Sequence, residues 1–82
     1  MYSLVIAEDE QMMRNGLTRM VRWDELGFSV DAVFSDGSEV LDYLKENIPD
    51  VLLMDIEMIA VTGLEVARFV AANKLPIKVI LL

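Results

Sequence analysis

The sequence has no cysteine and no histidine, and these two absences exclude several kinds of functional site. Without cysteine there is no disulfide framework, no thiolate nucleophile and no cysteine zinc site. Without histidine there is no Ser-His-Asp triad and no imidazole base. The side chains that remain for chemistry are mainly carboxylates, which most naturally surround a hard cation bound through oxygen.

Basic residues are also few, with 7 Lys and Arg against 14 Asp and Glu and a net charge of −7. Such a balance argues against a chain that grips a nucleic acid backbone. No apolar run approaches the ~20 residues needed to cross a bilayer. The N-terminus lacks the basic region and cleavage pattern of a secretory signal. We therefore expect a cytoplasmic protein without a membrane contact.

The hydrophobic fraction of 55% exceeds the ~45–50% of an ordinary soluble domain. With 82 residues the chain is at most one small domain, predicted over residues 1–82. The excess of apolar residues fits a sheet that is covered on both faces. Four apolar segments are predicted as strands, over residues 2–7, about 29–34, 51–55 and 77–82.

Between these strands the apolar residues have helical spacing, which predicts three helices. In the first helix, Arg14, Arg19 and Arg22 fall on the wetter sides. Its predicted core residues are Met12, Met13, Leu17, Met20 and Val21. The second helix, capped by Asp36 or Ser38 and closed by Pro49, is predicted to bury Val40, Leu41, Leu44 and Ile48. The third helix is predicted to begin with a Thr62–Glu65 capping box and to end near Asn73. Its predicted buried residues are Leu64, Val66, Ala67, Val70 and Ala71.

The alternation of strands and helices predicts an α/β fold, a doubly wound parallel sheet with right-handed crossovers. The chain stops inside the apolar run Val79–Leu82, with no turn or helix after it. This ending indicates a piece of a longer domain. We expect such a piece to be poorly stable and prone to associate through its last strand.

Acidic residues follow two of the predicted strands directly. Glu8 and Asp9 follow the first strand, and Asp55 ends the third. Ligands bind beyond the carboxyl ends of the strands in open parallel sheets, and neighbouring strands lie roughly 4.8 Å apart. If the two strands are neighbours, the three carboxylates can share one ion. A divalent cation removes the cost of placing like charges together, and Mg²⁺ suits a site with few protein carboxylates.

Three motifs in this order, Glu8-Asp9-Glu10, Met54-Asp55-Ile56-Glu57-Met58 and Thr62-Gly63-Leu64-Glu65, resemble the receiver domain of two-component response regulators. The likeness extends over all 82 residues. The connection from Trp23 to Phe28 looks like that of regulators whose receiver precedes an AraC-type helix-turn-helix domain. The resemblance implies a flavodoxin-like doubly wound sheet, incomplete after the fourth strand.

The resemblance also implies roles for the acidic residues. Asp55 would accept a phosphoryl group from a phosphohistidine of a sensor histidine kinase and would also bind Mg²⁺. Asp9 would bind the metal directly, Glu8 through a water, and Glu57 through its backbone carbonyl. The domain would not be a turnover enzyme. A homodimer is a further implied partner, and DNA would be reached only through a C-terminal output domain that the 82 residues do not include.

The sequence departs from the family pattern at several places. Ile59 stands where the family usually has proline, four residues after the phosphoacceptor. The family's switch Ser or Thr and its phosphate-contacting Lys would both come after Leu82. Two other functions therefore stay open. One is a pseudo-receiver that binds proteins without phosphorylation, and the other is a small Mg²⁺-dependent phosphohydrolase with Glu57 in place of the usual second aspartate.

Overall fold

A computed structural model describes residues 1–58 and 61–82 of the chain, so the predicted departure at Ile59 lies outside the described residues. Within those two ranges strands and helices alternate as predicted. The elements are β1 (Tyr2–Ala7), α1 (Gln11–Arg19), β2 (Phe28–Phe34), α2 (Gly37–Leu44), β3 (Val51–Met54), α3 (Gly63–Ala72) and β4 (Lys78–Leu81). No helix in this described part of the chain is long and apolar enough to span a bilayer.

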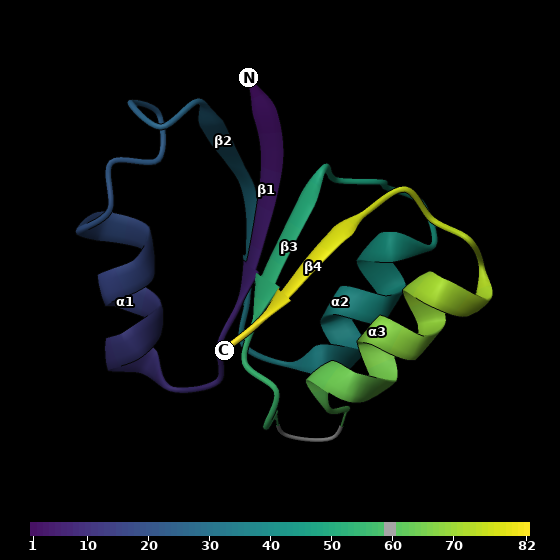
Figure 1. The fold of residues 1–82 in the computed structure, drawn as a ribbon. Coiled ribbons are helices and arrows are strands. Elements are labelled where there is room, and N and C mark those ends of the chain that lie inside the picture. The colour runs from purple at the N-terminus through teal and green to yellow at the C-terminus, as the bar shows by residue number, and fades with distance from the viewer. Residues whose placement is uncertain (59–60) are drawn as a thin grey trace.

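The described strands form one parallel sheet in the order β2-β1-β3-β4. The predicted doubly wound parallel sheet is therefore confirmed, and β1 and β3 are neighbours. In the register of the sheet, Ala7 at the end of β1 pairs with Phe34 of β2 and with Met54 of β3. The carboxyl ends of the strands lie together at the lower edge of the sheet in Figure 1. The segments that follow β1 and β3 thus leave the sheet side by side.

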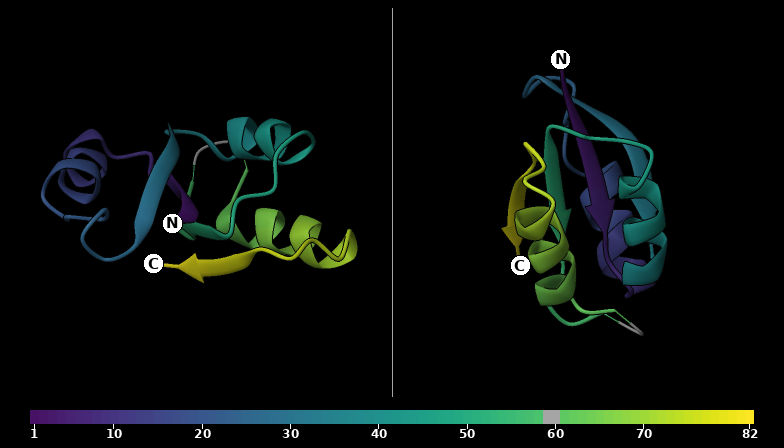
Figure 2. Two further views of the ribbon diagram at one scale, coloured as in Figure 1. Left: turned by 90° about the horizontal axis from the view of Figure 1, so that it is seen from above. Right: turned by 90° about the vertical axis from the view of Figure 1, so that its right-hand side faces the viewer.

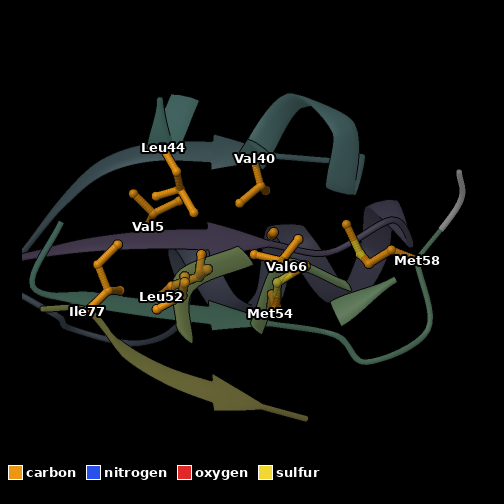
Figure 3. Packing of buried hydrophobic residues seen from close by; sticks show 10 residues of the cluster. Val5, Val40, Leu44, Leu52, Met54, Met58, Val66 and Ile77 are labelled. Carbon is orange, nitrogen blue, oxygen red and sulfur yellow. The ribbon is translucent and has the colours of Figure 1, made fainter. Parts of the chain in front are cut away.

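Helices cover both faces of the sheet, with α1 on one face and α2 and α3 on the other (Figures 1 and 2). The larger hydrophobic core lies between the sheet and α2 and α3 (Figure 3). Its buried members are Val5, Ala7, Val40, Leu44, Leu52, Met54, Met58, Val66, Val70 and Ile77. Burial of such side chains contributes about 1.5–3 kcal/mol each, which makes this face the main source of stability.

The smaller core lies on the α1 face and is built around Leu4, Ile6 and Leu53, with Leu17 and Trp23 packed against it among other half-buried residues. Helix α1 itself contributes no fully buried residue. The prediction that its methionines fill the core is wrong. Met12 and Met20 are 81% and 84% exposed, and Met13 is also exposed. Leu17 is the α1 side chain that packs against this core, so most of the apolar face of α1 stays uncovered.

Three further burial predictions are wrong, each because a helix ends or turns differently from its pattern. Helix α2 ends at Leu44, so Ile48 lies beyond it and is 57% exposed. Helix α3 turns Val66 and Val70 toward the core, with Phe69 packed beside them. Leu64 and Ala71 consequently face solvent.

The predicted helix starts are confirmed. The Asp36 carboxylate accepts a hydrogen bond from the Ser38 N–H at 2.8 Å. At α3 the Thr62 hydroxyl accepts from the Glu65 N–H at 3.3 Å, and the Glu65 carboxylate accepts from the Thr62 N–H at 3.0 Å. Such caps each contribute about 1 kcal/mol. Local side-chain caps therefore fix the first turns of α2 and α3.

Candidate functional site

Three carboxylates meet at the carboxyl edge of the sheet. One oxygen each from Glu8, Asp9 and Asp55 lies within 4.8 Å of the others. Main-chain hydrogen bonds continue the sheet by one residue here, because the Glu8 N–H donates to the Phe34 carbonyl at 3.0 Å and the Asp55 N–H donates to the Ala7 carbonyl at 3.1 Å. The position of the cluster therefore follows from strand pairing.

Glu8 is the most unusual member of the cluster because it is only 4% exposed. Its Oε2 atom is buried and has no hydrogen-bond partner among the described residues. Burial, followed by a hydrogen bond to Asp55 and by the negative charges of Asp55, Asp9 and Glu10, raises the pKa of Glu8 to about 7. Near neutral pH a proton therefore partly offsets the crowding of negative charge. A bound cation would serve the same purpose.

Asp55 is half-buried, and its carboxylate is held from one side. Its Oδ1 atom accepts a hydrogen bond from the Glu57 N–H at 3.1 Å. The loop backbone is also held by α3, since the Gly63 N–H donates to the Ile56 carbonyl at 2.9 Å. A Cβ atom at position 63 would lie 2.7 Å from the Asp55 carbonyl oxygen, so the close approach requires glycine. Asp55 thus sits on a supported loop rather than a free one.

Two other acidic residues from the sequence motifs lie outside the cluster. Glu57 is exposed, and its carboxylate is not among the three that converge. Its main chain contacts the site instead, through the N–H bonded to Asp55. Glu10 is exposed and begins α1 without a side-chain hydrogen bond to cap it.

One residue close to the site was not identified from the sequence. Arg14 was expected on the wetter side of its helix, yet it is half-buried and turned back toward the acidic segment. Its Nη1 atom donates to the carbonyl oxygens of Glu8 at 2.9 Å and Asp9 at 3.3 Å. The sequence feature that could have pointed to Arg14 is its place one turn into a helix that directly follows the acidic triplet of residues 8–10.

The chemistry of this donor set fits Mg²⁺. Hard divalent cations prefer carboxylate oxygen, and Mg²⁺ commonly uses few protein carboxylates while keeping water or phosphate in its remaining positions. The three oxygens converge, and Asp55 is only half-buried. The buried carboxylate of Glu8 has one oxygen without a partner among the described residues. The arrangement can hold a cation beside a carboxylate that a phosphate can reach.

Comparison with known proteins shows a family likeness over nearly the whole chain. A sequence profile described as the response regulator receiver domain matches residues 4–82. The transcriptional regulatory protein DesR of Bacillus subtilis is 39% identical over 68 residues, which cover 83% of this chain and 34% of DesR. An uncharacterized response regulatory protein of Staphylococcus epidermidis is 32% identical over 65 residues, 79% of this chain and 26% of that protein.

Among solved structures, the signal receiver domain of the response regulator NarL from Mycobacterium tuberculosis superimposes with a TM-score of 0.87 at 30% identity, covering 98% of this chain and 64% of that one. A DNA-binding response regulator of the LuxR family from Staphylococcus aureus gives a TM-score of 0.84 at 37% identity, covering 99% and 67%. The chain spans about a fifth to a third of the length of the curated relatives it matches. It belongs to the response regulator receiver domain family.

Proposed function

We propose that this chain is a phosphoacceptor switch in which Asp55 takes a phosphoryl group from the phosphohistidine of a sensor histidine kinase. The observation that carries the proposal is the convergence of Glu8, Asp9 and Asp55 at the sheet edge, with Asp55 half-buried on a loop held by α3. The phosphorylated state would control a downstream output, most naturally transcription, since relatives are transcriptional regulators.

In the transfer step an oxygen of Asp55 attacks the phosphorus, a new O–P bond forms and the N–P bond of phosphohistidine breaks. The electron pair of that bond returns to the imidazole. The Glu57 N–H, bonded to Oδ1, fixes the rotation of the carboxylate so that its other oxygen is free to attack. Correct placement is most of what phosphoryl transfer requires of a protein. The domain is consumed as a substrate in this step and is not a turnover enzyme.

Mg²⁺ is the proposed cofactor, held by the carboxylates of Asp9 and Asp55, by Glu8 through water and by the Glu57 carbonyl. When bound, it neutralises the charge of the incoming phosphoryl group. The buried Glu8 oxygen, which has no partner in residues 1–58 and 61–82, supports this assignment, because an isolated buried carboxylate is costly.

A protein partner is supported by the surface next to the site. Helix α1 begins just after the acidic segment, and its first turn exposes Met12 and Met13. Exposed methionines suit adaptable protein contacts, and a kinase that delivers its phosphohistidine to Asp55 must cover the surface around this edge. We propose cytoplasmic location and kinase contact together, with DNA binding confined to a separate output domain and a homodimer as a further assembly.

The test is phosphorylation of the full chain with acetyl phosphate and Mg²⁺, followed by intact mass. The wild type should gain one phosphoryl group, and Asp55→Asn should gain none. Asp42→Asn, which makes the same change at an exposed position of α2, is the matched control and should be phosphorylated like the wild type. Labelling of Asp55→Asn would refute the assignment. A wild type that takes no phosphoryl group and shows no saturable Mg²⁺ response would instead favour the pseudo-receiver. Steady release of phosphate from a phosphate ester would favour the hydrolase.

A further inference from the structure

Arg14 connects α1 to the segment that carries two of the site acids. Its main chain belongs to the helix, since its N–H donates to the Glu10 carbonyl at 2.9 Å and its carbonyl accepts from the Thr18 hydroxyl at 2.9 Å. Its guanidinium turns back and donates from one nitrogen to the carbonyls of Glu8 and Asp9 at 2.9 and 3.3 Å. The side chain therefore ties both peptide groups to the helix.

The segment has little other support where it enters the helix. Glu10 is the N-cap residue with an extended backbone, and its side chain makes no capping hydrogen bond. The starts of α2 and α3 are capped by Asp36 and Thr62. At α1 the stabilising hydrogen bonds come from Arg14, a residue within the helix. They are made to carbonyl groups, whereas a cap would bond the free amides of the first turn.

Arg14 also leaves the acidic side chains free. Within residues 1–58 and 61–82 the ion pairs closer than 4.0 Å are Arg22–Glu25 and Lys45–Asp42. The guanidinium thus holds the backbone of Glu8 and Asp9 while their carboxylates face Asp55. A cation can therefore approach those oxygens without displacing Arg14.

We propose that Arg14 is a positioning residue, which orients the peptide groups of Glu8 and Asp9 so that their carboxylates meet Asp55 in a geometry that binds a cation. The inference rests on the proposed function for the identity of that cation as Mg²⁺. It predicts that removal of this positive charge weakens cation binding, which is the opposite of the purely electrostatic expectation. By Coulomb attraction alone, removal of a positive charge beside a cation site would strengthen binding of the cation. Loss of positioning would weaken it.

The experiment measures Mg²⁺ affinity of the full chain from the amide chemical shifts of residues 8, 9 and 55 during titration. Arg14→Gln should raise the dissociation constant about tenfold, the scale of losing a group that orients metal ligands. Arg14→Lys keeps the charge but cannot reproduce the guanidinium geometry, and it should fall between the wild type and the Gln variant. Arg19→Gln removes a charge from an exposed position of the same helix and should leave the affinity within twofold of the wild type.

Phosphorylation by acetyl phosphate gives a second readout. At saturating Mg²⁺ the maximal rate of Arg14→Gln should return to within about twofold of the wild type, because the loss lies in binding the ion. An unchanged or tighter affinity of Arg14→Gln would overturn the proposal. If that variant does not fold by circular dichroism, Arg14→Lys decides, and wild-type affinity in the Lys variant would overturn it.

The two proposals fail in different ways. A wild type that binds Mg²⁺ but is never phosphorylated refutes the phosphoacceptor function, and the role of Arg14 is then judged on affinity alone. A wild type with no saturable Mg²⁺ response refutes the role of Arg14 as well.

Discussion

Replacing Glu8 with Gln should make the protein more stable at pH 8 in the absence of divalent cations. Glutamine has nearly the shape of glutamate but carries no charge, so it removes the cost of a buried anion beside two other carboxylates. The wild type bears that cost whenever Glu8 is ionised, since the side chain is 4% exposed and one of its oxygens has no partner among the described residues.

The size of the effect follows from the pKa of Glu8, which burial raises from 4.5 to about 7. At 1.36 kcal/mol per unit, this shift corresponds to about 3 kcal/mol of unfolding free energy. The folded state holds the proton of Glu8 more tightly than the unfolded chain does. Protonated Glu8 therefore contributes fully to the stability of the fold below pH 4.5, and this contribution is lost as the pH rises to about 7. The variant does not titrate at this position.

Urea unfolding followed by circular dichroism, in EDTA at several values between about pH 4.5 and pH 8, measures the difference. The two proteins should be nearly equal at the acidic end, and the variant should be more stable by about 3 kcal/mol at the basic end. Glu10→Gln, an exposed neighbour in the same triplet, should show no such divergence. A difference that does not change with pH, or a variant less stable than the wild type at pH 8, would refute the reasoning.

Three other substitutions test packing beside Asp55 and backbone conformation elsewhere in the fold. Gly63→Ala places a methyl group 2.7 Å from the Asp55 carbonyl, so it should cost about 1–3 kcal/mol in urea unfolding and weaken Mg²⁺ binding; an unchanged affinity would contradict the assigned support. A Cβ atom at position 16 would meet open space in the helix, so Gly16→Ala should raise the free energy of unfolding by about 0.5–1 kcal/mol. A lower free energy of unfolding would contradict this. Lys74 has a φ of 51° just after α3, so Lys74→Gly should raise Tm by several degrees; a lower Tm would contradict relief of strain.

The fold and the placement of the acids were predictable because they depend on strong local signals. An apolar run that ends in Asp55 and another that ends at Glu8 can be recognised without coordinates, and parallel strands deliver both to one edge. The capping pair Thr62 and Glu65 is equally local, because both hydrogen bonds join residues three apart.

The errors arose where tertiary contact decides the outcome. The spacing of Met13 and Met20 shows that α1 is amphipathic, but it cannot show how much of that apolar face the sheet covers. Ile48 continues the helical pattern of α2, yet the residue before a proline is biased away from helical backbone, and the helix ends earlier. The role of Arg14 depends on where a long side chain bends, which no spacing rule describes.

Trp23, the single tryptophan of the chain, anchors the far end of the molecule. Its indole N–H donates to the Leu17 carbonyl at 2.6 Å, and its ring meets Phe28 edge-on at 6.0 Å. Phe28 pairs with Tyr2 at the start of β1, whereas Glu8 follows the end of that strand, roughly 20 Å away at the rise of an extended chain. The indole therefore lies too far from the acidic edge to contact an ion bound there. A change in its emission upon addition of Mg²⁺ would report a shift of α1 against the sheet rather than quenching by a nearby ion.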